Sequence, residues 1–68
     1  MQTYKVFNFD SRNSVYYTAQ GLTKNNARDI AIRLSKETTA HKAQIESEQS
    51  NYFEQYEYGE KTEWSLIN

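Results

Sequence analysis

The chain has 68 residues, no cysteine and no proline, so we expect one compact domain over residues 1–68 without a disulfide framework. Its only histidine, His41, leaves no ligand set for a structural zinc site. No apolar run approaches 18 residues and the N-terminal sequence lacks a signal-peptide core. We therefore expect a cytoplasmic protein without membrane contact.

The net charge of −1 is divided unevenly along the chain. Residues 1–42 carry seven basic and three acidic side chains, a net charge of +4, whereas residues 43–68 carry one and six, a net charge of −5. If the fold separates these halves, one surface is basic and another acidic; otherwise the charges simply solubilise the domain.

The first two predicted elements are strands over residues 3–9 and 14–19, which are rich in β-branched and aromatic residues. Residues 10–13 favour a turn, which makes the strands a hairpin. With that loop, the side chains directed to the core are those of Tyr4, Val6, Val15, Tyr17 and Ala19. Those directed away are Lys5, Phe7, Phe9 and Tyr16. A one-residue slip would reverse the two sets, so the sequence leaves open whether Val6 or Phe7 faces the core.

A helix is predicted over residues 24–37. Thr23 is a suitable N-cap, because its hydroxyl can accept a hydrogen bond from the first turn. Ala27, Ile30, Ala31 and Leu34 recur at helical spacing and form one apolar stripe. The two alanines in this stripe would let the helix approach its neighbour closely.

Residues 43–48 alternate between apolar or small and polar side chains and predict a third strand. Residues 51–58 and 61–67 flank Gly59-Glu60, which suits a two-residue type II′ turn. That turn would place Phe53, Trp64 and Leu66 on the helix-facing side. The opposite face would then receive Tyr52, Tyr56, Tyr58, Lys61, Glu63 and Ile67.

The fold class is therefore α+β: an antiparallel sheet of four to five strands with one helix packed on one face, in the order ββαββ or ββαβββ. A lone helix covers one face of a sheet, so the other face should be rich in tyrosine. An exposed aromatic patch often marks a binding or dimerisation surface. Tyrosines are also good strand formers whose rings pair across strands, which is the structural alternative.

We expect no enzymatic activity, no cofactor and no metal. His41 has no nucleophile placed near it by the sequence, and the two glycines are too far apart to form a phosphate-binding loop. Pairs such as Glu54 and Glu57 would need an enclosed site to act as acid and base, for which the chain offers little volume.

Two surfaces are candidates for partner binding. Lys24, Arg28, Ile32 and Lys36 form one helical row that projects away from the apolar stripe, and they suit an acidic protein groove or phosphates. The structural alternative is an ordinary solvated helix face. On the sheet, the candidate residues are Tyr16, Tyr52, Tyr56 and Tyr58, which could stack nucleic-acid bases. Nearby glutamates would repel a nucleic-acid backbone.

Several short patterns resemble small phage-encoded inhibitor proteins. These are the Ala27-Arg28-x-Ile30-Ala31 pattern, His41, Ile45-Glu46 and the hairpin over residues 56–64. Together they are similar to a compact anti-CRISPR family that acts on type I CRISPR surveillance complexes, over roughly residues 22–64. The resemblance implies a protein that occupies the nucleic-acid-binding surface of a host ribonucleoprotein stoichiometrically. The acidic C-terminal half departs from that family and raises the alternative of partial nucleic-acid mimicry.

The sequence thus predicts a non-catalytic phage or mobile-element protein that binds and blocks a host protein or nucleoprotein complex in the host cytoplasm. It would act as a monomer or homodimer, with at most weak nucleic-acid contact. The alternative function is a small single-stranded nucleic-acid-binding protein that uses the tyrosine-rich sheet face.

Overall fold

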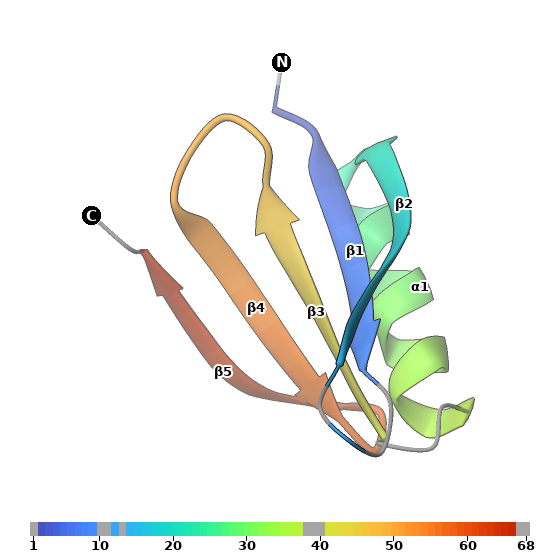
Figure 1. The fold of residues 1–68 in the computed structure, drawn as a ribbon. Helices are drawn as coiled ribbons and strands as arrows, with labels where there is room; N and C mark the ends of the chain where they lie inside the picture. The colour runs from blue at the N-terminus through green and yellow to red at the C-terminus, as the bar shows by residue number, and fades with distance from the viewer. Residues whose placement is uncertain (1, 10–11, 13, 38–40, 67–68) are drawn as a thin grey trace.

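Strand and helix signals follow one another along the chain in the order ββαβββ. The computed structural model has these elements in that order and packs them into an α+β fold (Figure 1). It describes residues 2–9, 12, 14–37 and 41–66, and within these ranges it does not describe the side chains of residues 17 and 63–66. The described elements are β1 (Tyr4–Phe9), β2 (Val15–Leu22), α1 (Lys24–Glu37), β3 (Lys42–Ser47), β4 (Tyr52–Glu57) and β5 (Glu60–Leu66). The strands form one antiparallel sheet in the order β2-β1-β3-β4-β5. The predicted fold class and strand number are confirmed.

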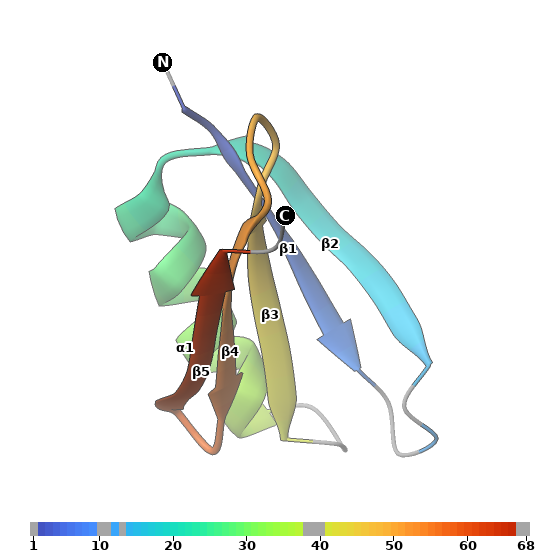
Figure 2. The ribbon, with the colours of Figure 1, turned by 90° about the vertical axis from the view of Figure 1, so that its left-hand side faces the viewer.

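The helix α1 begins and ends where the sequence predicts. The Thr23 Oγ1 atom accepts a hydrogen bond from the Asn26 N–H at 3.2 Å, which confirms the N-cap. Ala27 and Ala31 are fully buried, while Ile30 and Leu34 are partly buried against the same core. Small side chains at the contact let the helix lie close to β1 and β3, with β4 at its flank (Figures 1 and 2).

The helix-facing side of the sheet is formed by alternate residues of β1 and β3. Tyr4 and Val6 are buried on β1, so Val6 rather than Phe7 faces the core. Ala43, Ile45 and Ser47 are buried on β3, as predicted. The opposite side of the sheet carries no helix in the described part of the chain (Figure 2).

The register of the first hairpin differs from the prediction. Phe9 pairs with Val15, so the loop is one residue longer than expected and Val15 shares the face of Phe9. Val15 is 56% exposed rather than part of the core. Tyr16 pairs with Asn8, which places it on the helix side of the sheet and not on the far side. An irregularity between the pairings of Val6 and Phe7 then returns the strand to the predicted alternation. The predicted inward side chain of residue 17 lies outside the described side chains.

The second hairpin turns one residue earlier than predicted. Tyr58 and Gly59 have φ angles of 53° and 86°, the two positive values that a type I′ turn requires, and Glu57 pairs with Glu60. An irregularity between the pairings of Gln55 and Tyr56 then shifts the register, so that Glu54 pairs with Trp64. On the other side of β4, Glu54 pairs with buried Ile45 of β3, which places Glu54 on the helix-facing side of the sheet in place of Phe53. The prediction of Phe53 in the helix-facing core is wrong, because Phe53 pairs with Glu46 of β3, which lies on the face of the sheet opposite the helix. The predicted core packing of Trp64 and Leu66 lies outside the described side chains.

Candidate interaction surface

Glu54 lies fully buried between β4 and α1, where four donors meet its two carboxylate oxygens. Arg28 donates from Nε to Oε1 at 2.8 Å and from Nη2 to Oε2 at 2.5 Å. The Tyr56 hydroxyl donates to Oε1 at 2.6 Å, and the Tyr52 hydroxyl donates to Oε2. A bidentate guanidinium and two phenols thus satisfy a carboxylate that burial alone would strongly destabilise. We call these four residues the Glu54 cluster.

The Glu54 cluster holds its carboxylate ionised. Burial by itself would raise the pKa of Glu54, but the hydrogen bonds from Arg28, Tyr52 and Tyr56 outweigh it and lower that pKa to about 2. Burial and the hydrogen bond to Glu54 raise the pKa of Tyr56, and the same causes raise the pKa of Tyr52. The hydrogen bond to Glu54 also raises the pKa of Arg28 above its ordinary value. No member of the cluster is thereby poised to exchange a proton near neutral pH.

The cluster changes the interpretation of three predicted binding residues. Tyr56 is 4% exposed and therefore does not lie on an open tyrosine face. Tyr52 packs against the core, and Arg28 is engaged with Glu54. No local pattern indicates that Glu54 is buried, since a single glutamate in an aromatic strand is typical of a solvent-facing position. The combination of Arg28 on the helix with two tyrosines flanking Glu54 is the signal that could have identified it.

The rest of the helical row follows the same flank of the sheet. The Lys24 Nζ atom lies 4.5 Å from the centre of the Tyr52 ring, within the range of a cation–π contact. Ile32 packs against the core. Lys36 is exposed, but its side chain runs so close to Gly59 that a Cβ there would lie 2.4 Å from Lys36 Cε. The row therefore lies along β4 and the β4–β5 turn, which corrects the prediction that it projects away from the core.

Tyr58 protrudes from the β4–β5 turn and is 69% exposed. Its ring stacks on His41 with 4.7 Å between ring centres, and its N–H donates to the His41 carbonyl at 3.0 Å. The Gly59 N–H donates to the Oγ of buried Ser35 at 2.8 Å. Tyr58 and the exposed Tyr16 thus lie near opposite edges of the sheet. The four predicted tyrosines do not form one surface.

The face of the sheet opposite α1, which we call the open face, carries the phenylalanines instead. A shallow hollow of about 340 Å³ on it is lined by Phe7, Phe9, Val15, Gln44 and Glu46. The Lys42 Nζ atom lies 4.5 Å from the centre of the Phe9 ring, and the Lys5 Nζ atom lies 5.5 Å from that of Phe7. Apolar rings bordered by lysine, glutamine and glutamate make this an amphipathic surface. The prediction that Phe7 and Phe9 point away from the helix is confirmed.

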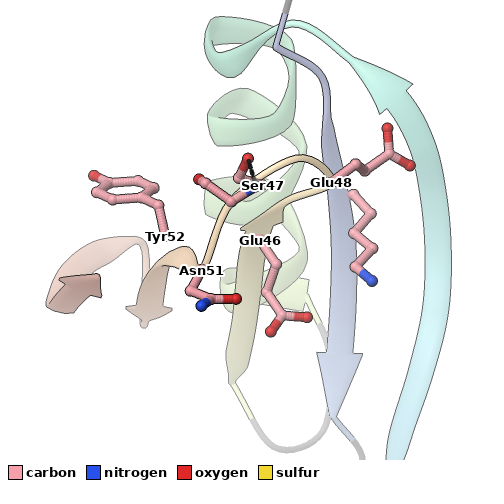
Figure 3. Close-up of a pocket in the computed structure, with 7 residues that line it drawn as sticks. Glu46, Ser47, Glu48, Asn51 and Tyr52 are labelled. Carbon is pink, nitrogen blue, oxygen red and sulfur yellow. Dashed lines mark hydrogen bonds between the residues drawn. The ribbon is translucent and has the colours of Figure 1, made fainter. Parts of the chain in front are cut away.

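A second hollow, of about 290 Å³, lies beside the connection between β3 and β4 (Figure 3). It is lined by Lys5, Glu46, Ser47, Glu48, Ser50, Asn51 and Tyr52. The Ser47 Oγ atom accepts hydrogen bonds from the N–H groups of Gln49 and Ser50, so it is committed to holding the turn. Figure 3 shows Glu46, Glu48 and Tyr52 pointing in different directions instead of converging on one point. Across the described residues, no group of three or more acidic or histidine side chains is placed to hold a metal ion.

Comparison with known proteins finds no matching family model, no matching curated protein and no matching solved structure. Among the described residues, no helix is both long and apolar enough to cross a bilayer.

Proposed function

We propose that the protein is a non-catalytic inhibitor from a phage or other mobile element, which binds a host protein or nucleoprotein complex in the host cytoplasm through its open face. The observation that carries this proposal is the unequal covering of the sheet. The helix covers one face (Figure 2), while the other carries a hollow that is lined by buried Phe9, partly buried Phe7 and the exposed Val15.

The chemistry of the two faces supports binding over catalysis. The strongest convergence of polar groups in the described chain is the Glu54 cluster, whose carboxylate is buried and fully bonded. The open face instead combines aromatic rings with a polar and charged border, the composition of many protein interfaces. Such a surface supports recognition of a protein partner and requires no cofactor.

The resemblance to type I anti-CRISPR proteins makes a CRISPR surveillance complex the partner that we propose to test first. In this mechanism the protein would occupy a surface that target DNA needs, and one copy would block one site. The open face carries both lysine and glutamate, so its contacts with such a complex would be mixed rather than uniformly acidic. This composition supports recognition of a protein surface more than wholesale nucleic-acid mimicry.

The alternative of single-stranded nucleic-acid binding has less support. Base stacking needs accessible aromatic faces. The Tyr52 and Tyr56 rings instead pack in or against the core, and their hydroxyl groups donate hydrogen bonds to Glu54. A labelled oligonucleotide titrated at two salt concentrations distinguishes the two functions. Submicromolar affinity that falls steeply with salt would favour the alternative.

The direct test compares capture of a purified type I surveillance complex by the wild type and by two lysine variants. Gln44→Lys adds a charge to the hollow on the open face, and Asn25→Lys adds the same charge to an exposed position on the helix. We expect wild type and Asn25→Lys to capture the complex and to reduce its binding of target DNA, and Gln44→Lys to do neither. Capture that survives Gln44→Lys, or fails in both variants equally, would contradict binding through the open face.

A further inference from the structure

We infer that two copies of this chain associate through the outer edge of β2, with the two β2 strands antiparallel across a two-fold axis. β2 is a terminal strand of the sheet, and in the described part of the chain no strand lies beyond it. An edge strand offers main-chain groups to a further strand, and proteins commonly guard such edges against association.

The two edges of this sheet are guarded differently. The β5 edge carries Glu60, Lys61 and Glu63 within seven residues. The β2 edge has the sequence VYYTAQGL over eight residues and contains no charged side chain. Charged residues on an edge oppose pairing with another molecule. At β2, therefore, no charged side chain of the strand opposes the pairing of a further strand.

Large apolar side chains are exposed where β2 begins. Val15 is 56% exposed and Tyr16 is 52% exposed; among the described residues, only Tyr58 joins them as an exposed large hydrophobic side chain. The register places Val15 on the open face and Tyr16 on the helix side. Strand pairing at this edge would therefore bury apolar surface on both faces of the sheet at once.

A second copy fits this edge better than a charged partner strand. When an uncharged strand pairs with itself, no like charges oppose each other, whereas pairing of β5 with itself would bring an acidic strand against its own copy. A two-fold pairing of β2 with β2 also closes at two molecules, while β2 with β5 would build an open chain of molecules. The pairing of β2 with β1 is regular only from Val15 to residue 17, and an irregular strand limits the length of the ladder that its outer edge can form with a second copy. We therefore expect a weak, concentration-dependent dimer.

Sedimentation equilibrium of the purified protein, over about 10 µM to about 1 mM, tests this inference without any host partner. Wild type should change from monomer to dimer over that range. Tyr16→Lys should weaken dimerisation by at least about tenfold, because a lysine on an edge strand opposes pairing. Thr62→Lys places the same charge at an exposed position of β5 and should leave dimerisation unchanged. Circular dichroism melts confirm that both variants remain folded.

Nuclear Overhauser effects between labelled and unlabelled copies locate the contact. They should join β2 of one copy to β2 of the other. A wild type that stays monomeric at about 1 mM would overturn the inference, as would a dimer that tolerates Tyr16→Lys or that shows contacts at β5. Val15 belongs to both surfaces, but Tyr16 lies outside the open face and Gln44 lies outside β2. Tyr16→Lys therefore tests the dimer without altering the capture surface, and Gln44→Lys tests capture without altering the β2 edge.

Discussion

The two faces of the sheet differ in where they place charged and aromatic groups. On the covered face, a fully buried carboxylate accepts hydrogen bonds from four donor groups, so its charge stabilises the packing of the helix on the sheet. On the open face, the Phe7 and Phe9 rings lie beneath lysine side chains beside a hollow. A charged residue in the sequence therefore does not by itself identify a binding surface. Arg28 was predicted to contact a partner, yet the structure uses it to neutralise Glu54.

The largest expected effect comes from breaking the Glu54 cluster. Arg28→Ala leaves Glu54 buried with only phenol donors, and we expect it to lower the free energy of unfolding by about 3 kcal/mol. This figure is at the low end for a buried pair because the Arg28 side chain is 33% exposed and partly screened by solvent. Urea unfolding at pH 7 measures the loss. Arg33→Ala, at an exposed position of the same helix, should change stability by less than about 0.5 kcal/mol. Equal losses in the two variants would show that the cluster does not stabilise the covered face.

The same cluster predicts a stability change in acid. The pKa of Glu54 is about 2 in the folded protein, against an ordinary value of 4.5. A carboxyl group whose pKa is lower in the folded state stabilises the folded protein at pH values above its unfolded-state pKa. For Glu54 this stabilisation is lost as the pH falls from about 4.5 to about 2. The contribution amounts to at most about 3 kcal/mol. Urea midpoints between pH 6 and pH 2 should therefore fall less steeply for Glu54→Gln than for wild type.

The control for this pH dependence is Glu48→Gln, at an exposed position on the connection between β3 and β4. Its profile should follow that of the wild type, because the Glu48 side chain is exposed and its hydrogen bond from the Thr3 hydroxyl lies at the surface. If Glu54→Gln kept the full acid dependence, the titrating group would have to lie elsewhere and the charged form of Glu54 would not stabilise the fold.

A smaller effect is expected where the helix meets the β4–β5 turn. Ser35 Oγ accepts the Gly59 N–H at 2.8 Å and donates to the Ile32 carbonyl, also at 2.8 Å. Ser35→Ala leaves a main-chain donor without this partner at a buried position, so we expect a loss of about 1–2 kcal/mol. Thermal and urea unfolding measure it, with exposed Ser50→Ala as the control. A loss no larger than that of the control would mean that the turn is held by its own backbone conformation.

The helix was predictable because its signals are local. A threonine cap, two alanines at helical spacing and a run without glycine act within a few residues of each other. The third strand was predictable for the same reason, since small or apolar and polar residues alternate along it. These local features are enough to predict one helix and a strand after it, and with the hairpin signals they indicate an α+β fold.

The hairpin registers were not predictable from local signals. Gly59 suits the second position of a type I′ turn as well as the first position of a type II′ turn, and Tyr58 is an unusual residue for the left-handed conformation that it adopts. Its stacking on His41 comes from a contact distant in sequence. The turn sets which residues of β5 oppose β4, whereas the pairing of β4 with β3, also distant in sequence, places Glu54 rather than Phe53 on the helix side. The Glu54 cluster was missed because its position depended on this register.

The smallest effect on stability is expected on the open face, together with a large effect on binding. Val15→Ser changes an exposed side chain, so the free energy of unfolding should fall by less than about 0.5 kcal/mol. Capture of the partner should nevertheless weaken, because Val15 lines the hollow. Ile45→Val on the covered face should show the reverse, a loss of about 0.5–1.5 kcal/mol with capture unchanged. Urea unfolding and a capture assay on both variants, run beside Tyr16→Lys to separate any effect of dimerisation, complete the comparison. If Val15→Ser destabilised the fold as much as Ile45→Val and left capture intact, the open face would be an extension of the core and not a surface for recognition.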